Sequence, residues 1–135
     1  MVQTTPAVDS FLHARPTATL GTLMRDGSPQ ASVLWYLWDD GEFVMSTIDR
    51  TAKWHNLKRD PRCSLCIEEP ESGQMVVAYG DASLDDGDVR SRTREIVDKY
   101  YDDPADTEAH MDRIFSTDDR VLIVVRPQRM LTRNL

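Results

Sequence analysis

Long hydrophobic runs are absent from this sequence. Nowhere in its 135 residues do about 18 apolar residues follow one another, the length that a membrane-spanning helix needs. Residues 1–9 lack the basic segment followed by an apolar segment that defines a secretory signal. We therefore expect a cytoplasmic protein with no membrane partner.

Positive charge is also scarce. The chain has 16 Lys and Arg against 23 Asp and Glu, which gives a net charge of −7 at pH 7. A protein with this balance is not expected to bind nucleic acid, because that binding depends on neutralising phosphates with many cations. Any anionic ligand must instead be held by a local cluster of cations that acts against the overall charge.

Cysteine occurs only twice, as Cys63 and Cys66. A Cys-x-x-Cys spacing can mark a redox pair or half of a zinc site. Here the two residues lie in a segment that is typical of a strand, where positions three apart point to opposite faces. No second pair of ligands is present, so we expect two free thiols that pack as buried small hydrophobic side chains, and no metal site.

The length suits one domain over residues 1–135. Turn signals such as Asp26-Gly27 and Asp40-Gly41 separate β-rich runs and predict an antiparallel meander of the first three strands. In all, the pattern predicts six strands, at 17–24, 30–38, 42–47, 63–68, 74–84 and 120–126. Compact hairpins with inserted helices favour a mostly β barrel over a doubly wound sheet. The expected helices are 8–14, 50–59, 85–101 and, more weakly, 107–115.

The last predicted strand has an unusual composition. Residues 121–125 read Val-Leu-Ile-Val-Val, which is apolar on both faces of a strand. A strand face that cannot meet water often meets another chain. From this run we expect a homodimer.

The junction between the third strand and the helix after it concentrates groups that bind anions. Hydroxyl residues end the strand, and Arg50 and Lys53 stand at the start of the helix. Free backbone N–H groups and the helix dipole favour an anion there, whereas cations normally avoid this end. One interpretation is a phosphate site. The other is that Asp49 caps the helix and pairs with Lys53 on a solvated face.

Three segments of the chain, 20–23, 26–38 and 46–62, resemble the pyridoxamine 5′-phosphate oxidase-like split β-barrels. The specific phrase is Thr51-Ala-Lys-Trp-His-Asn-Leu-Lys-Arg-Asp-Pro-Arg62. The similarity is strongest to the coenzyme F420-dependent flavin/deazaflavin oxidoreductase branch and spans almost the whole chain. It implies a six-stranded, antiparallel, Greek-key-like split barrel of the FMN-binding type, with a cofactor at a dimer interface.

The resemblance also implies roles for individual residues. The family's phosphate-binding lysine falls on Lys53, and the arginine that many members carry two positions earlier is replaced by Thr51, so that Arg50 is the nearest upstream cation. The partner subunit would contribute residues near 129–131. Further cofactor contacts are expected from hydroxyls beside the phosphate and from the second strand along the ring, namely Ser46, Thr47, Thr51, Gln30, Ser32, Val33, Leu34 and Trp35.

Aromatic and histidine residues add less. Alternation places Trp35 on one strand face and Tyr36 with Trp38 on the other, where core packing accounts for them. His13 and His110 have no informative partners in the sequence, and we interpret both as surface residues. His55 lies within the predicted phosphate helix, where a ligand contact is possible.

The function implied by the resemblance is hydride transfer from reduced coenzyme F420 to a C=C or C=N bond of a small-molecule substrate. The cofactor would supply the chemistry, and solvent or Tyr36 the balancing proton. The alternatives are an FMN-dependent oxidoreductase of the same fold, including an oxidase of pyridoxamine phosphate, and a non-catalytic carrier of a flavin, a deazaflavin or a tetrapyrrole. The sequence identifies no catalytic residue.

Overall fold

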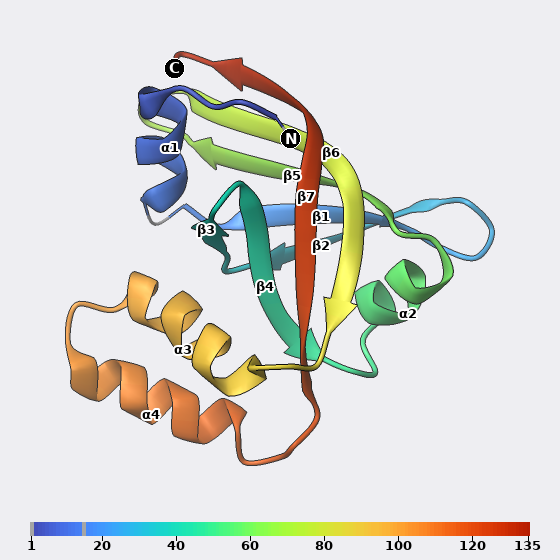
Figure 1. The fold of residues 1–135 in the computed structure, drawn as a ribbon, viewed down its shortest axis with the longest axis vertical. Helices are drawn as coiled ribbons and strands as arrows, with labels where there is room; N and C mark the ends of the chain where they lie inside the picture. Colours follow the sequence, from blue (N-terminus) through green and yellow to red (C-terminus); the bar gives the residue numbers. More distant parts are fainter. Residues whose placement is uncertain (1, 15) are drawn as a thin grey trace.

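The computed structural model describes residues 2–14 and 16–135. Strands form one curled sheet, with α1 at one end and the α3–α4 hairpin beside β4 (Figure 1). The elements are α1 (Pro6–His13), β1 (Ala18–Leu23), β2 (Pro29–Leu34), β3 (Leu37–Asp39), β4 (Glu42–Ile48), α2 (Ala52–Arg59), β5 (Arg62–Glu69), β6 (Gln74–Asp85), α3 (Val89–Tyr100), α4 (Pro104–Ile114) and β7 (Arg120–Arg133).

The sheet has seven antiparallel strands in the order β2-β1-β5-β6-β7-β4-β3. Its two edges, β2 and β3, are separated in the chain by only Trp35 and Tyr36. A link of this length spans only about 10 Å, so the two edges must come close together and the sheet must curl. The mostly β split-barrel prediction is confirmed.

The prediction of six strands was wrong by one, because the strand expected at 30–38 is broken. Its first half pairs with β1 and its second half with β4, so the expected meander does not continue through it. Side chains of α3 satisfy the backbone at the break. The Tyr36 N–H donates to the Tyr100 hydroxyl at 3.3 Å, and Lys99 Nζ donates to the Tyr36 carbonyl at 3.0 Å.

A close backbone approach bends the long β6–β7 ribbon. The register shifts between Tyr79 and Gly80, so that Tyr79 faces Arg129 while Gly80 faces Pro127. A Cβ atom on Gly80 would lie 2.4 Å from the carbonyl oxygen of Arg126. Glycine is therefore required at this position for the two strands to pack at the bend.

The main core fills the inside of the curl, and α1 closes one end of it. Leu12, Leu20, Tyr36, Phe43 and Ile123 are all fully buried there. Trp38 and Phe43 pack with their ring centroids 4.6 Å apart. As alternation predicts, Tyr36 and Trp38 lie in this core and Trp35 does not.

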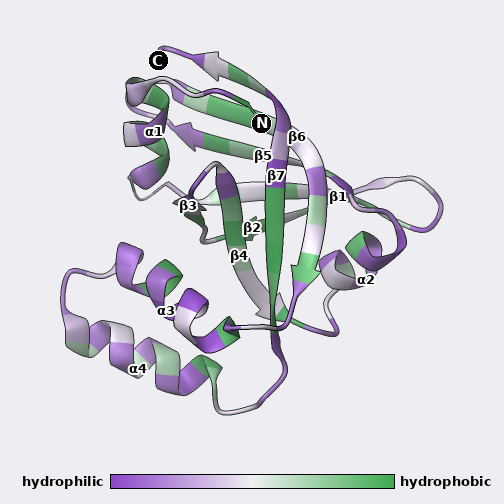
Figure 2. Cartoon of the chain, viewed as in Figure 1, coloured by the Kyte–Doolittle hydropathy of each residue, from purple (hydrophilic) through white to green (hydrophobic). Residues whose placement is uncertain are grey.

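A second, smaller cluster explains the doubly apolar strand. The outer face of β4 and β7 carries Val44 and Leu122, which form a buried cluster with Ile96 of α3. Much of β4 and β7 has the colour of hydrophobic residues in Figure 2. The apolar run at 121–125 therefore finds its cover within the chain and is not by itself a reason to expect a second subunit. The homodimer stays a prediction that needs another basis.

Another face of the sheet is not covered by any helix of the described residues, 2–14 and 16–135. One cross-strand row on this face consists of Val33, Thr19, Cys66, Val77 and Leu131, in that order from β2 to β7. Val33 is 70% exposed and Leu131 is 51% exposed. Such a mostly uncharged row on an open sheet is typical of a protein–protein contact. We call this surface the open face.

Candidate functional site

A cavity of about 300 Å³ lies where β2, β4 and β7 meet the start of α2 and the α3–α4 hairpin. Among the residues that the structure describes, no Asp or Glu lines it, although the chain has 23 of them. Two cations do. The lining residues are Val33, Leu34, Trp35, Ser46, Thr47, Ile48, Lys53, Thr93, Ile96, Val97, His110, Ile114 and Arg120.

Lys53 stands in the first turn of α2 and is half-buried. Burial lowers the pKa of its ammonium group, and the nearby Arg120 guanidinium lowers the same pKa further. No carboxylate within residues 2–14 and 16–135 forms an ion pair with it. A desolvated lysine beside a second cation is unfavourable on its own and becomes favourable when an anion binds.

Arg120 supplies the second cation, and sequence reasoning missed it. It begins β7, where it pairs with Ile48 at the end of β4, so the sheet register brings it to the cavity. Its guanidinium donates to the Ser46 hydroxyl at 3.2 Å and, more weakly, to the Ile114 carbonyl at 3.4 Å. No local signal in the sequence marks this residue, because it lies 67 positions beyond Lys53.

Ser46 is placed to donate a hydrogen bond into the cavity. Its oxygen accepts hydrogen bonds from Thr93 at 2.8 Å and from Arg120 at 3.2 Å. A hydroxyl oxygen has two lone pairs, so both are used and the remaining proton is available to an acceptor. An anion in the cavity would be such an acceptor.

The two predicted threonines flank the turn between β4 and α2, Thr47 in the strand and Thr51 at the helix N-cap. Thr47 is buried and lines the cavity, with its hydroxyl 3.4 Å from that of Thr51. Thr51 is the residue before the first turn of the helix, and its hydroxyl donates to the Ile48 carbonyl at 3.2 Å. The cavity therefore gains Thr47 directly and Thr51 only as support.

Arg50 lies outside the cavity lining. Its guanidinium forms an ion pair with Asp119 and its side chain is 63% exposed. The alternative in which Asp49 caps the helix and pairs with Lys53 is not observed, because Thr51 occupies the cap position and Asp49 lies 4.0 Å from Arg50. Arg120 thus takes the position beside Lys53 for which Arg50 was expected.

The second-strand residues divide into two groups. Val33, Leu34 and Trp35 line the cavity. The Gln30 amide instead accepts from Thr22 at 2.8 Å and donates to Ser32 at 2.8 Å, which ties both polar side chains of β2 to the sheet. Gln30 and Ser32 lie outside the lining of the cavity.

His110 was expected at the surface, and this prediction was wrong. The residue lines the cavity, and its ring stacks on Trp35 with centroids 5.0 Å apart. Tyr100 stacks on the same indole at 4.6 Å. Burial lowers the pKa of His110, and the cations of Arg113 and Arg120 lower it further. His55, by contrast, is exposed on α2 and lies outside the lining.

Tyr36 cannot serve this cavity as a proton donor. Its side chain is fully buried in the main core and does not line the cavity. Burial raises the pKa of its hydroxyl, and the nearby Tyr100 raises it further. The two cysteines also lie elsewhere, with Cys63 against the core and Cys66 on the open face, as alternation predicts. Burial raises the pKa of the Cys63 thiol to about 12.

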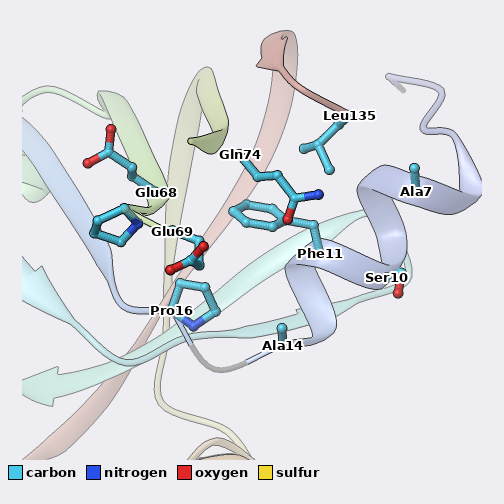
Figure 3. A pocket seen from close by; sticks show the side chains of 10 residues that line it. Ala7, Ser10, Phe11, Ala14, Pro16, Glu68, Glu69, Gln74 and Leu135 are labelled. Atoms are coloured by element: carbon cyan, nitrogen blue, oxygen red, sulfur yellow. The ribbon is translucent and has the colours of Figure 1, made fainter. Parts of the chain in front are cut away.

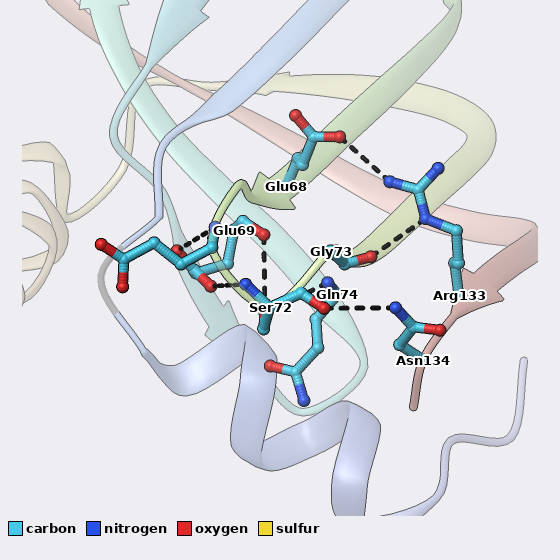
Figure 4. A network of polar contacts seen from close by, with 8 residues as sticks. Glu68, Glu69, Ser72, Gly73, Gln74, Arg133 and Asn134 are labelled. Carbon is cyan, nitrogen blue, oxygen red and sulfur yellow. Dashed lines mark hydrogen bonds and ion pairs between the residues drawn. The ribbon is translucent and has the colours of Figure 1, made fainter.

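A larger cavity, of about 730 Å³, lies between α1 and the β5–β6 turn (Figure 3). Its walls include Phe11, and its two carboxylates are already engaged. Glu69 accepts from the backbone N–H of Ser72 at 2.6 Å, and Glu68 pairs with Arg133 at 3.1 Å (Figure 4). Among the described residues that line this space, the charged side chains are Glu68 and Glu69, and both are already engaged, so size alone does not make it the site.

None of the helices in the described ranges, 2–14 and 16–135, is long and apolar enough to cross a membrane. Within the same ranges, no group of three His, Cys, Asp or Glu residues is placed to hold a metal ion.

Comparison with known proteins places this geometry in context. The family model described as "Pyridoxamine 5′-phosphate oxidase" matches residues 4–134. An F420 reductase of known structure is 23% identical, with a TM-score of 0.73, over 91% of this chain and 94% of that one. A conserved hypothetical protein from Mycobacterium tuberculosis is 25% identical, with a TM-score of 0.76, over 98% of this chain and 85% of the other. A heme binding protein from Mycobacterium smegmatis is 24% identical, with a TM-score of 0.72, over 98% of this chain and 55% of its own length.

Proposed function

The chain belongs to the pyridoxamine 5′-phosphate oxidase family, and on that premise we propose that it is an oxidoreductase that binds coenzyme F420 in the cavity beside Lys53. The observation that carries the proposal is the pairing of two partly buried cations, Lys53 and Arg120, in a cavity with no acidic lining among the described residues. Such a site suits a ribityl phosphate.

Different residues of the cavity would bind different parts of the cofactor. Lys53 and Arg120 would contact the phosphate as cations, and the Ser46 hydroxyl would donate its remaining proton to it. Val33, Leu34 and Trp35 form a mostly apolar wall along which a flat ring can lie. The α3–α4 hairpin lines the other side of the cavity. When bound, the cofactor supplies hydride for an unsaturated small-molecule substrate.

A second copy of the chain would complete the site. The cavity is at the small end of ligand pockets, which measure about 300–1,000 Å³, so a ring that follows β2 would extend beyond it. Val33 belongs both to the cavity wall and to the open face. A homodimer formed through the open face would therefore place partner residues near 129–131 against the ring, as the family resemblance implies.

The alternative cofactor is FMN, which presents the same ribityl phosphate. The deciding experiment is a titration of the purified protein with FMN and with F420 side by side, followed by flavin absorbance and deazaflavin fluorescence. Tighter binding of F420 than of FMN supports the proposal. Tighter binding of FMN assigns the site to FMN instead. If the protein binds neither compound, the assignment of a cofactor to this cavity is refuted.

Turnover separates an enzyme from a carrier. Protein loaded with reduced F420 is mixed with a panel of enones and quinones, and cofactor oxidation is followed against a control without protein. Oxidation that depends on both protein and substrate supports the oxidoreductase. Tight binding with no turnover over the panel favours a carrier of the same cofactor.

A further inference from the structure

Of the two ring nitrogens of His110, Nδ1 has hydrogen-bond partners and Nε2 has none among the residues that the structure describes. Its Nδ1 atom lies 3.0 Å from an Arg113 guanidinium nitrogen and 3.0 Å from the Tyr101 hydroxyl. Arginine can only donate, so Nδ1 must be the acceptor and cannot carry a hydrogen. The hydrogen of the neutral ring therefore sits on Nε2.

The surroundings of His110 keep the ring neutral. A second proton would have to occupy Nδ1 and would displace the Arg113 contact. The charged groups near the ring are Arg113 and Arg120, and both oppose a further positive charge. No hydrogen-bond partner for Nε2 is found among residues 2–14 and 16–135.

The position of His110 in the cavity indicates what its free N–H serves. The ring is held by stacking on Trp35, and Tyr101 contacts it edge-on at 5.6 Å. The Nε2 side of an imidazole faces away from the Nδ1 partners, and His110 lines the cavity. Lys53 and Arg120 already provide two cations for an anion, whereas a neutral N–H beside an aromatic wall suits a neutral acceptor.

We propose that His110 is a ligand-binding residue whose Nε2–H donates a hydrogen bond to a carbonyl oxygen of the molecule bound against Trp35. The inference rests on the proposed function, because it needs a ligand in this cavity. Flavins and deazaflavins carry carbonyl oxygens on the ring, and enone or quinone substrates carry them too. Tyr101 and Arg113 act as positioning residues, because they fix the tautomer through Nδ1.

The first test measures the tautomer directly and needs no ligand. Long-range ¹⁵N–¹H correlation spectra of the histidine rings, assigned with His110→Phe, are recorded at pH 7. The expected result is a neutral Nε2–H tautomer for His110 with a pKa below the ordinary value of about 6.5. A neutral Nδ1–H tautomer, or a ring protonated at pH 7, overturns the proposal.

The second test compares two variants with three probes. His110→Phe keeps an aromatic ring against Trp35 but removes the N–H, and His110→Gln restores a donor near the Nε2 position. Loss of one neutral hydrogen bond weakens binding by about 3- to 10-fold. The binding probes are FMN, riboflavin, which lacks the phosphate, and inorganic phosphate as a competitor, and the KM for an enone is measured with the cofactor-loaded protein. His55→Gln, which changes an exposed histidine, is the matched control, and thermal melts check that each variant folds.

Each pattern of results has a distinct meaning. If His110→Phe weakens FMN and riboflavin equally, and His110→Gln recovers most of the loss, the acceptor is on the cofactor ring. If cofactor binding is unchanged while KM for an enone rises, the acceptor is on the substrate. Weaker competition by inorganic phosphate, or no change in any assay, overturns the proposal. Failure of the unmodified protein to bind FMN and F420 instead refutes the proposed function.

Discussion

Replacement of Lys53 by methionine should change cofactor affinity and protein stability in opposite directions. The ammonium group is half-buried, has no ion-pair partner among the described residues and lies near Arg120. Without a ligand, these features make the charge unfavourable. With a phosphate bound, the same charge forms a hydrogen-bonded ion pair. Removal of a lysine that serves only the fold would instead lower both the cofactor affinity and the protein stability.

The expected loss of affinity follows from the strength of hydrogen bonds to charged groups. Such a bond contributes about 1.5–3 kcal/mol, which corresponds to about 10- to 150-fold in Kd. Arg120 and Ser46 remain in Lys53→Met, so binding should weaken without vanishing. The melting temperature of the ligand-free variant should be equal to or above that of the unmodified protein, because a desolvated charge has been removed.

The assay pairs isothermal titration with FMN and F420 with thermal melts of the ligand-free protein. Lys58→Met is the matched control, since Lys58 is on the same helix, is exposed and lies 5.7 Å from the Trp54 ring centroid, outside the cavity lining. Its affinity should stay within about twofold of the original. The reasoning is refuted if Lys53→Met binds both cofactors normally, or if its ligand-free form melts clearly lower.

Four other predictions concern five substitutions. Titration should show Arg120→Met losing at least tenfold in cofactor affinity. Arg50→Met breaks only the exposed pair with Asp119, so it should keep its affinity and lose little stability. Val33→Asp on the open face should yield a monomer in light scattering where the unmodified protein is a dimer, and a dimeric variant would contradict the proposed interface. Burial lowers the Lys99 pKa to about 8 from 10.5. Between these two pH values the unfolded chain binds more protons than the folded protein, so the part of the unfolding free energy that comes from Lys99 should increase from about pH 8 to 10.5. In denaturant titrations, the unfolding free energy of Lys99→Met should not show this increase with pH. If the variant has the same pH profile of stability as the unmodified protein, the prediction is wrong. Gly80→Ala should destabilise by about 1–3 kcal/mol in the same assay, because its Cβ would meet the Arg126 carbonyl, and a neutral result would contradict the close approach.

The parts of the site that sequence could reveal are those that are local in the chain. Ser46, Thr47 and Lys53 lie within eight residues, and the end of a strand before a helix brings them to one place. The helix start, the hairpin turns and the inward and outward alternation of Cys63 and Cys66 follow from the same local rules.

The parts that sequence could not reveal depend on pairing between distant strands. Arg120 reaches the cavity because β7 pairs with β4, and His110 reaches it because α4 packs beside α3. Neither contact has a periodic pattern that points to it. The break after Leu34 was missed for a related reason, since its backbone groups are satisfied by Tyr100 and Lys99 of a helix more than 60 residues away.

The central claim is that Lys53 and Arg120 together bind the phosphate of a flavin-type cofactor. A crystal structure of the protein with F420 or FMN tests it most directly. The account predicts phosphate oxygens within hydrogen-bonding distance of both cations and of the Ser46 hydroxyl, with the ring along Trp35. A phosphate bound elsewhere, such as the larger cavity beside α1, with Lys53 and Arg120 left without an anion, would contradict it.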